Sequence, residues 1–129
     1  KIIAIIKNDE HSGEAELRMQ YVKVLCANIF EIVKTVNAAK GWKLIAIGSD
    51  YDGLINHLDF YPTAADMPTL RKDMLAFFKN PTEISQPGLN YTLTLPEINR
   101  LMFGLSAEDI IDKIFAGNTM TFLQNNFNR

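Results

Sequence analysis

Lys43-Leu-Ile-Ala-Ile-Gly-Ser-Asp-Tyr-Asp-Gly53 is the stretch of sequence on which the expected fold depends. Its first half, Leu44 to Ile47, is a short unbroken apolar run, which is typical of a strand buried on both faces of a parallel sheet. Gly48 ends the run, and the carboxylates Asp50 and Asp52 follow at once. In α/β proteins, ligands bind at the carboxyl ends of parallel strands. The stretch therefore predicts a strand that presents two acids at a functional site.

The sequence before this stretch completes a βαβ unit. The apolar run Ile2 to Ile6 predicts a first strand. Residues 14–40 predict a long helix ending at Gly41, because apolar side chains recur there at a spacing of three and four on one face (Val22, Leu25, Cys26, Ile29, Val33 and Val36). A strand, a helix and a second strand in this order predict parallel strands joined by a right-handed crossover.

The sequence after the stretch predicts mostly short helices. Pro68 suits the first turn of a helix that continues to Phe78, and Leu95-Pro96 opens another. Ser106, with Asp109 three residues later, resembles a capping box at the start of a helix running to Ala116. A last helix is expected from Asn118 to about Asn126, and Tyr91 to Leu95 predicts a short edge strand.

Composition limits the classes of function. The chain has 129 residues, 47% apolar and 22% charged, with a formal net charge of −2, as expected of one globular domain. Lys and Arg form no cluster, so nothing indicates a nucleic-acid partner, and no apolar run is long enough to span a membrane. The single cysteine, Cys26, excludes an internal disulfide and leaves the cellular compartment open. The chain begins at Lys1, directly before a strand-like run, which predicts that it is truncated.

Three blocks of sequence, in order, resemble the membrane (renal) dipeptidase family, zinc hydrolases of the amidohydrolase superfamily. Ile45 to Gly53 is similar to the family segment hGhGSDFDG. Residues 62–75 are similar to its proline, aspartate and p-x-L-x-x-x-L pattern, and residues 104–118 to its closing G-hS-x-E-D-I-x-K-I-h-G-G-N element. The resemblance covers residues 43–78 and 104–123. It implies a C-terminal fragment of a (β/α)8 TIM-type barrel: about two parallel strands with flanking helices, forming one partial domain over residues 1–129.

The resemblance implies that Asp50 is the catalytic residue. The matching aspartate of the family lies at the end of the eighth barrel strand, takes the proton of the metal-bridging water and passes it to the leaving amine. A carboxylate can relay protons there because zinc lowers the pKa of its bound water to roughly 7. The residues alone leave open that Asp50 caps a nearby backbone N–H. Asp52 is expected to shape the site loop by bonding backbone N–H groups, with Gly53 permitting the turn.

The metal ligands of the family are missing from this segment. Its dinuclear zinc site uses a His-x-Asp pair, a bridging glutamate and two later histidines, all upstream of the GSDFDG segment, and residues 1–42 supply no such set. His11 and His57 fall in no ligand motif and are expected to be exposed loop histidines. We therefore expect zinc and a dipeptide or related amide substrate in the parent protein, with no metal bound by this segment and no activity by it alone.

Two readings from other classes remain. The run from Ile45 to Gly53 also resembles the start of haloacid-dehalogenase phosphatases, where the first acid is the nucleophile, the second an acid/base, and Mg²⁺ binds between them. That motif normally has threonine where this chain has Leu54, and no later Asp-Asp pair follows. The other reading is a non-catalytic α/β interaction module. Because two strands leave open edges, the sequence predicts homo-oligomerisation or association with the missing N-terminal part.

Overall fold

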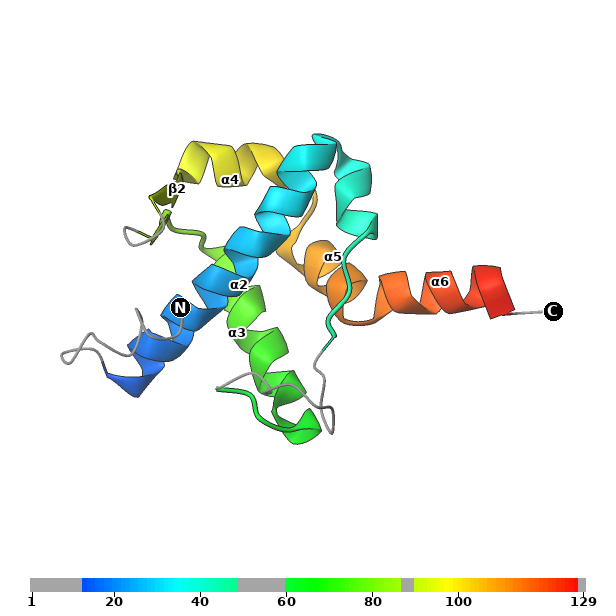
Figure 1. Cartoon of the computed structure of the whole chain (residues 1–129), viewed down its shortest axis with the longest axis horizontal. Coiled ribbons are helices and arrows are strands. Elements are labelled where there is room, and N and C mark those ends of the chain that lie inside the picture. The colour runs from blue at the N-terminus through cyan, green and yellow to red at the C-terminus, as the bar shows by residue number, and fades with distance from the viewer. Residues whose placement is uncertain (1–12, 49–59, 87–89, 128–129) are drawn as a thin grey trace.

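The computed structural model describes residues 13–48, 60–86 and 90–127, which are mainly helical (Figure 1). η1 and η2 are 3₁₀ turns, and η4 is a π-helical turn that joins α5 to α6. The elements follow in the order α2 (Glu14–Val36), η1 (Ala39–Lys43), η2 (Ala64–Asp66), α3 (Met67–Lys79), β1 (Ile84–Gln86), β2 (Tyr91–Leu93), α4 (Leu95–Leu101), α5 (Ala107–Asp112), η4 (Lys113–Gly117) and α6 (Asn118–Phe127).

The expected α/β fold, a barrel fragment with two parallel strands, is wrong. The one sheet of the described residues has two short strands, β1 and β2, which pair antiparallel with Ile84 opposite Leu93. β2 falls where the sequence predicts an edge strand. The expected first strand, Ile2 to Ile6, lies outside the described residues.

The expected strand from Leu44 to Ile47 is also wrong. Leu44 is 68% exposed, although the pattern predicts burial on both faces. A strand needs a neighbouring strand to pair its backbone groups, and this segment instead lies against helices. The N–H of Ile47 donates to the carbonyl of Ile114 in η4, at 3.3 Å. The apolar run therefore packs against helices and not in a sheet, and Ile45 is its one buried large side chain.

The long helix is confirmed as α2, but it ends at Val36 rather than at Lys40. Asn37 ends it in the left-handed region, at φ 47° and ψ 40°, with its N–H bonded to the carbonyl of Val33. Asparagine tolerates this conformation better than most residues. Gly41, the expected cap, lies in η1, where an added Cβ would be 3.2 Å from the Cα of Val33. Glycine at this position therefore permits the close approach of η1 to α2.

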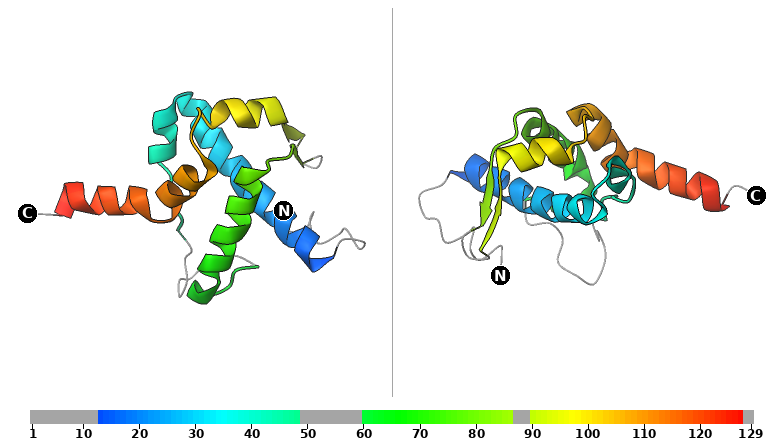
Figure 2. Two further views of the ribbon diagram at one scale, coloured as in Figure 1. Left: turned by 180° about the vertical axis from the view of Figure 1, so that it is seen from behind. Right: turned by 90° about the horizontal axis from the view of Figure 1, so that it is seen from above.

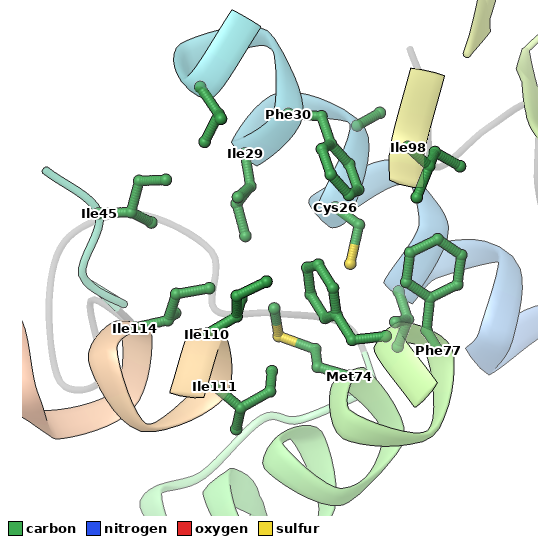
Figure 3. Close-up of a cluster of buried hydrophobic side chains, with 14 of the residues drawn as sticks. Cys26, Ile29, Phe30, Ile45, Met74, Phe77, Ile98, Ile110, Ile111 and Ile114 are labelled. Carbon is green, nitrogen blue, oxygen red and sulfur yellow. The ribbon is translucent and has the colours of Figure 1, made fainter. Parts of the chain in front are cut away.

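The core forms where α2 crosses α3 and α5 packs beside α3 (Figures 1 and 2). Figure 3 shows Cys26 and Phe30 of α2 facing Met74 of α3, with Ile110 of α5 completing the cluster. Phe30 also contacts Trp42 of η1, with ring centroids 5.6 Å apart. These contacts join elements that are distant in sequence into one apolar core.

The C-terminal helices follow the sequence expectations closely. Thr94 and Glu97 form a reciprocal capping box at the start of α4, and the Ser106 hydroxyl accepts the N–H of Asp109 at the start of α5. Gly117, where a break is expected, instead lies in η4, which leads directly into α6. α6 extends away from the body in every view of Figures 1 and 2, and it has no buried residue.

Replacing Phe30 by alanine is expected to lower the free energy of unfolding by about 3–5 kcal/mol, because it empties a fully buried aromatic site. Urea denaturation followed by circular dichroism would measure the change. Ile32→Ala is the matched control on the same helix, since Ile32 is 46% exposed, and it should cost much less. Equal losses in the two variants would contradict this description of the core.

Candidate functional site

The residues to which the sequence assigns chemistry, Asp50, Asp52 and Gly53, lie outside the described residues, as do His11 and His57. The structure does describe the segments that precede and follow them. We call residues 42–48 the entry segment and residues 60–66 the exit segment. Both are held by polar side chains from distant parts of the chain.

The side chain of Asn118 holds the entry segment. Its Nδ2 donates to the carbonyl of Trp42 at 2.8 Å and to that of Ile45 at 2.7 Å. An amide NH₂ has two hydrogens, so one side chain can serve both acceptors. Asn118 is the first residue of α6, and its partners are more than seventy positions earlier in the chain. It therefore fixes the entry segment against the C-terminal helices.

The π-helical turn η4 supplies a third hydrogen bond to the entry segment. In a regular α-helix the carbonyl of Ile114 would accept the N–H of Asn118. Here the Asn118 N–H donates to the carbonyl of Lys113, and the carbonyl of Ile114 accepts the N–H of Ile47. π-helical turns often occur at functional sites. The irregularity thus makes a main-chain acceptor available to the entry segment.

Trp42 anchors the start of the entry segment in the core. Its ring is fully buried and contacts Phe30 and Phe78, with centroids 5.6 and 5.7 Å away. Its Nε1–H donates to the carbonyl of Leu101 at 2.9 Å, so the buried donor is satisfied. The segment therefore leaves the core from a fixed point.

The exit segment is held by a polar cluster around the buried carboxylate of Asp73. The hydroxyl of Tyr61 donates to Oδ2 of Asp73 at 2.8 Å, and Nε of Arg18 lies 2.9 Å from the same oxygen. Burial, followed by the hydrogen bond to Asp73, raises the pKa of Tyr61 well above its ordinary value, so the hydroxyl remains a donor. The cluster links the exit segment to α2 and α3.

Asp66 shapes the rest of the exit segment. Its carboxylate accepts the N–H and the hydroxyl of Thr63, at 3.0 and 2.7 Å, and makes no capping bond to α3. Asp66 therefore fixes the loop at Thr63 and does not cap α3.

An open hollow of about 420 Å³ adjoins Asn118, where the end of η1 faces η4 and α6. Lys43 and Lys113 line it together with Thr121 and Asn125. Neither lysine forms an ion pair with another residue of the described part. Two lysines and three asparagines (Asn118, Asn125 and Asn126) thus line the hollow.

Metal-binding side chains do not gather in the part of the chain that the structure describes: no three His, Cys, Asp or Glu residues lie close enough to hold an ion. The thiol of Cys26 is in the core, where burial raises its pKa, so it is neither a ligand nor a nucleophile. The described residues thus do not fit a zinc centre of their own.

Sequence reasoning missed the residues that hold the two segments. It assigned Asn118 only to the start of a helix, and it left Arg18 and Asp73 without a role. Asn118 is the last residue of the third block that resembles the dipeptidase family, which was the one available signal. The partners of Asp73 carry no local motif.

No family model matches the chain, and neither a curated protein nor a solved structure matches it. Among the described helices, none is both long and apolar enough to cross a membrane.

Replacing Tyr61 by phenylalanine should change how stability depends on alkaline pH. The folded state keeps Tyr61 protonated, whereas in the unfolded chain its hydroxyl has an ordinary pKa of about 10. Stability from this difference is fully present below pH 10 and is lost as the pH rises above it.

Above pH 10, the free energy of unfolding of Tyr61→Phe should therefore fall less steeply than that of the wild type, by up to about 1.4 kcal/mol per pH unit. Below pH 9 the variant should differ by a constant loss of about 1–2 kcal/mol, from the missing hydrogen bond. Urea denaturation at pH 7 to 11 would test this. Parallel curves throughout that range would exclude the effect.

Proposed function

We propose that this chain is the C-terminal portion of a metal-dependent, dipeptidase-like hydrolase that cleaves an amide bond with a zinc-activated water. Asp50 takes a proton from the attacking water and delivers it to the amine nitrogen as the C–N bond breaks. In the family that the three blocks resemble, the metal ligands come before the matching aspartate, and we assign the ligands of this hydrolase in the same way. The chain would carry out this hydrolysis without the parallel-stranded barrel fragment, which the antiparallel sheet contradicts.

One observation supports the proposal most directly. The first and third of the blocks similar to the dipeptidase family are in contact, because Asn118 and Ile114 of the third bond to residues 42–47. Those residues lead straight into Ser49-Asp50. Chance similarities scattered along a chain need not meet in space. Here they form one unit at the approach to the proposed acid.

The exposed apolar side chains also favour a chain that is completed by other polypeptide. Leu44 in the entry segment and Phe122, Leu123 and Phe127 in α6 are all exposed. Large exposed apolar areas mark interaction sites in soluble proteins. These side chains offer a contact surface for the remainder of the hydrolase.

The acid is tested in the longer polypeptide that contains these residues, by assaying dipeptide hydrolysis with zinc. Asp50→Asn should lower kcat by about 10²–10⁴-fold, the usual contribution of a proton-transfer group. Asp52→Asn is the matched control, two positions away in the same loop, and should change kcat less than tenfold. The isolated chain should not hydrolyse dipeptides with or without zinc.

Two outcomes would overturn this function. One is wild-type turnover by the Asp50→Asn enzyme. The other is Mg²⁺-dependent hydrolysis of p-nitrophenyl phosphate by the isolated chain, abolished by Asp50→Asn, which would establish the phosphatase reading instead.

The isolated chain should self-associate through α6, because the exposed apolar side chains then have no other cover. Sedimentation velocity should show a species larger than the monomer that increases with concentration. The double variant Phe122→Ser/Leu123→Ser should shift the distribution toward monomer, whereas Thr119→Ser, on the same helix, should not. A wild-type chain that stays monomeric at all concentrations would contradict this.

A further inference from the structure

We propose that the hollow beside α6 binds a short acidic peptide in extended form. Lys43 and Lys113 pair with carboxylates of the peptide, and polar side chains of α6 bond to its main chain. The site is separate from the hydrolysis proposed above and does not depend on it.

The hollow runs along α6 for about two turns. The residues of this helix that line it recur at a spacing of three and four, as residues on one face of a helix do: Asn118, Thr121, Phe122, Asn125 and Asn126. The rise from the first to the last of them is about 12 Å. An extended peptide covers about 3.3 Å per residue, so the hollow matches a peptide of about three or four residues.

Two lysines from distant elements supply the positive charge. Lys43 ends η1 and Lys113 begins η4, and no Asp or Glu is among the described residues that line the hollow. The acids of α5, which precedes Lys113, are engaged with other side chains: Glu108 with Lys79, Asp109 with Ser106, and Asp112 with Arg71. The two ammonium groups are therefore available to carboxylates of a ligand.

The polar side chains of α6 limit the ligand further, because most of their free groups are oxygens. The Asn118 amide donates both hydrogens to backbone carbonyls, and the hydroxyl of Thr121 donates to the carbonyl of Gly117 at 2.8 Å. Nδ2 of Asn126 donates to the carbonyl of Phe122, also at 2.8 Å. The oxygens that remain are acceptors. Phosphate oxygens are acceptors too, whereas a peptide has an N–H donor at each residue except proline. The lining therefore fits an acidic peptide better than an inorganic anion.

The ring of Phe122 gives the hollow one apolar contact. Phe122 lines the hollow and is 60% exposed, so an aliphatic side chain of the peptide can pack on it. Exposed pairs of lysine and carboxylate each contribute little to affinity. We therefore expect weak binding, with a Kd of about 0.1–1 mM.

Saturation-transfer difference NMR with the whole chain measures binding of this strength. The probe is the tetrapeptide Glu-Leu-Glu-Leu, acetylated and amidated, and its neutral control has glutamine in place of both glutamates. The acidic peptide should bind at least tenfold more tightly than the control. Its Kd should rise at least threefold when the NaCl concentration is raised from about 0.05 to 0.5 M, because salt screens exposed charges. Equal affinities of the two peptides would overturn the proposal.

The lysines are tested by substitution with glutamine. Lys43→Gln and Lys113→Gln should each raise the Kd of the acidic peptide at least threefold, and the double variant should bind it no better than the neutral peptide. Lys40→Gln is the matched control, since Lys40 is an exposed lysine of the same 3₁₀ turn that does not line the hollow. It should change the Kd less than twofold. An equal effect of all three single substitutions would show attraction to net charge alone and would refute the site.

Asn125 tests whether the main chain of the peptide is recognised. Asn125→Leu keeps the approximate size of the side chain and removes its amide, so it should raise the Kd of the acidic peptide at least threefold. Gln124→Met, at the neighbouring position outside the lining, is the control and should have no effect. Inorganic phosphate, used as a second probe, should bind at least tenfold more weakly than the acidic peptide. Phosphate binding as tight as that of the peptide, or an unchanged Kd in Asn125→Leu, would show that the hollow is not a peptide site.

A second copy of the chain is the other possible source of acids for the hollow. Sedimentation velocity separates it from a peptide ligand, because the double lysine variant should associate to the same extent as the wild type. A shift of that variant toward monomer would show that the hollow holds acids of a second copy, which would overturn its assignment to a separate peptide. These measurements involve neither Asp50 nor zinc, so a failure of the proposed hydrolysis is distinguished from a failure of this site.

Discussion

The burial of Trp42 is the interaction on which the described structure depends. Its ring lies between Phe30 and Phe78, and its Nε1–H is satisfied by the carbonyl of Leu101. Three helices, α2, α3 and α4, therefore meet at one side chain. An aromatic residue of this size contributes several kcal/mol when it is fully buried. Because Trp42 also begins the entry segment, the stability of the core and the placement of that segment have a common origin.

The two segments that flank the proposed acid in sequence are held by different kinds of hydrogen bond. The entry segment is bound through its main chain, by a side-chain amide and by a carbonyl released at a π-helical turn. The exit segment is bound through the phenol of Tyr61, which bonds to the buried carboxylate of Asp73. A main-chain contact is independent of the side chains it holds, whereas the phenol contact is specific to tyrosine. The entry segment can thus vary in sequence at positions other than Trp42 and Ile45, whose side chains are buried in the core.

The helices could be predicted from the sequence because their signals are local. The spacing of Val22, Cys26, Ile29 and Val33 identifies the buried face of α2, and Ser106 with Asp109 identifies the start of α5. The expected strand at Leu44 to Ile47 fails because a short apolar run does not distinguish a strand from a segment packed on helices. A strand also requires a partner, which is a property of the whole chain. The barrel inferred from the resemblance depended on that strand.

In the candidate site, too, the residues with a local sequence signal could be predicted and those with distant partners could not. Asp50, Asp52 and Gly53 stand out in the sequence because acids and glycine directly follow an apolar run. Asn118 could not be identified in this way, since its partners are carbonyl groups, which every residue has. Arg18, Tyr61 and Asp73 come from three separate parts of the chain and meet only after folding. Side chains that act on a distant backbone leave no pattern near themselves.

The π-helical turn between α5 and α6 has an evolutionary consequence. Such a turn is equivalent to one residue inserted into an α-helix, and it costs the helix one regular hydrogen bond. Deleting one residue from Lys113–Gly117 would restore the regular ladder and return the carbonyl of Ile114 to its own helix. Because the turn already absorbs the extra residue, the helix after such a deletion would keep about its present orientation. The deletion would therefore leave the path of α6 nearly unchanged and remove the Ile114 acceptor from the Ile47 N–H.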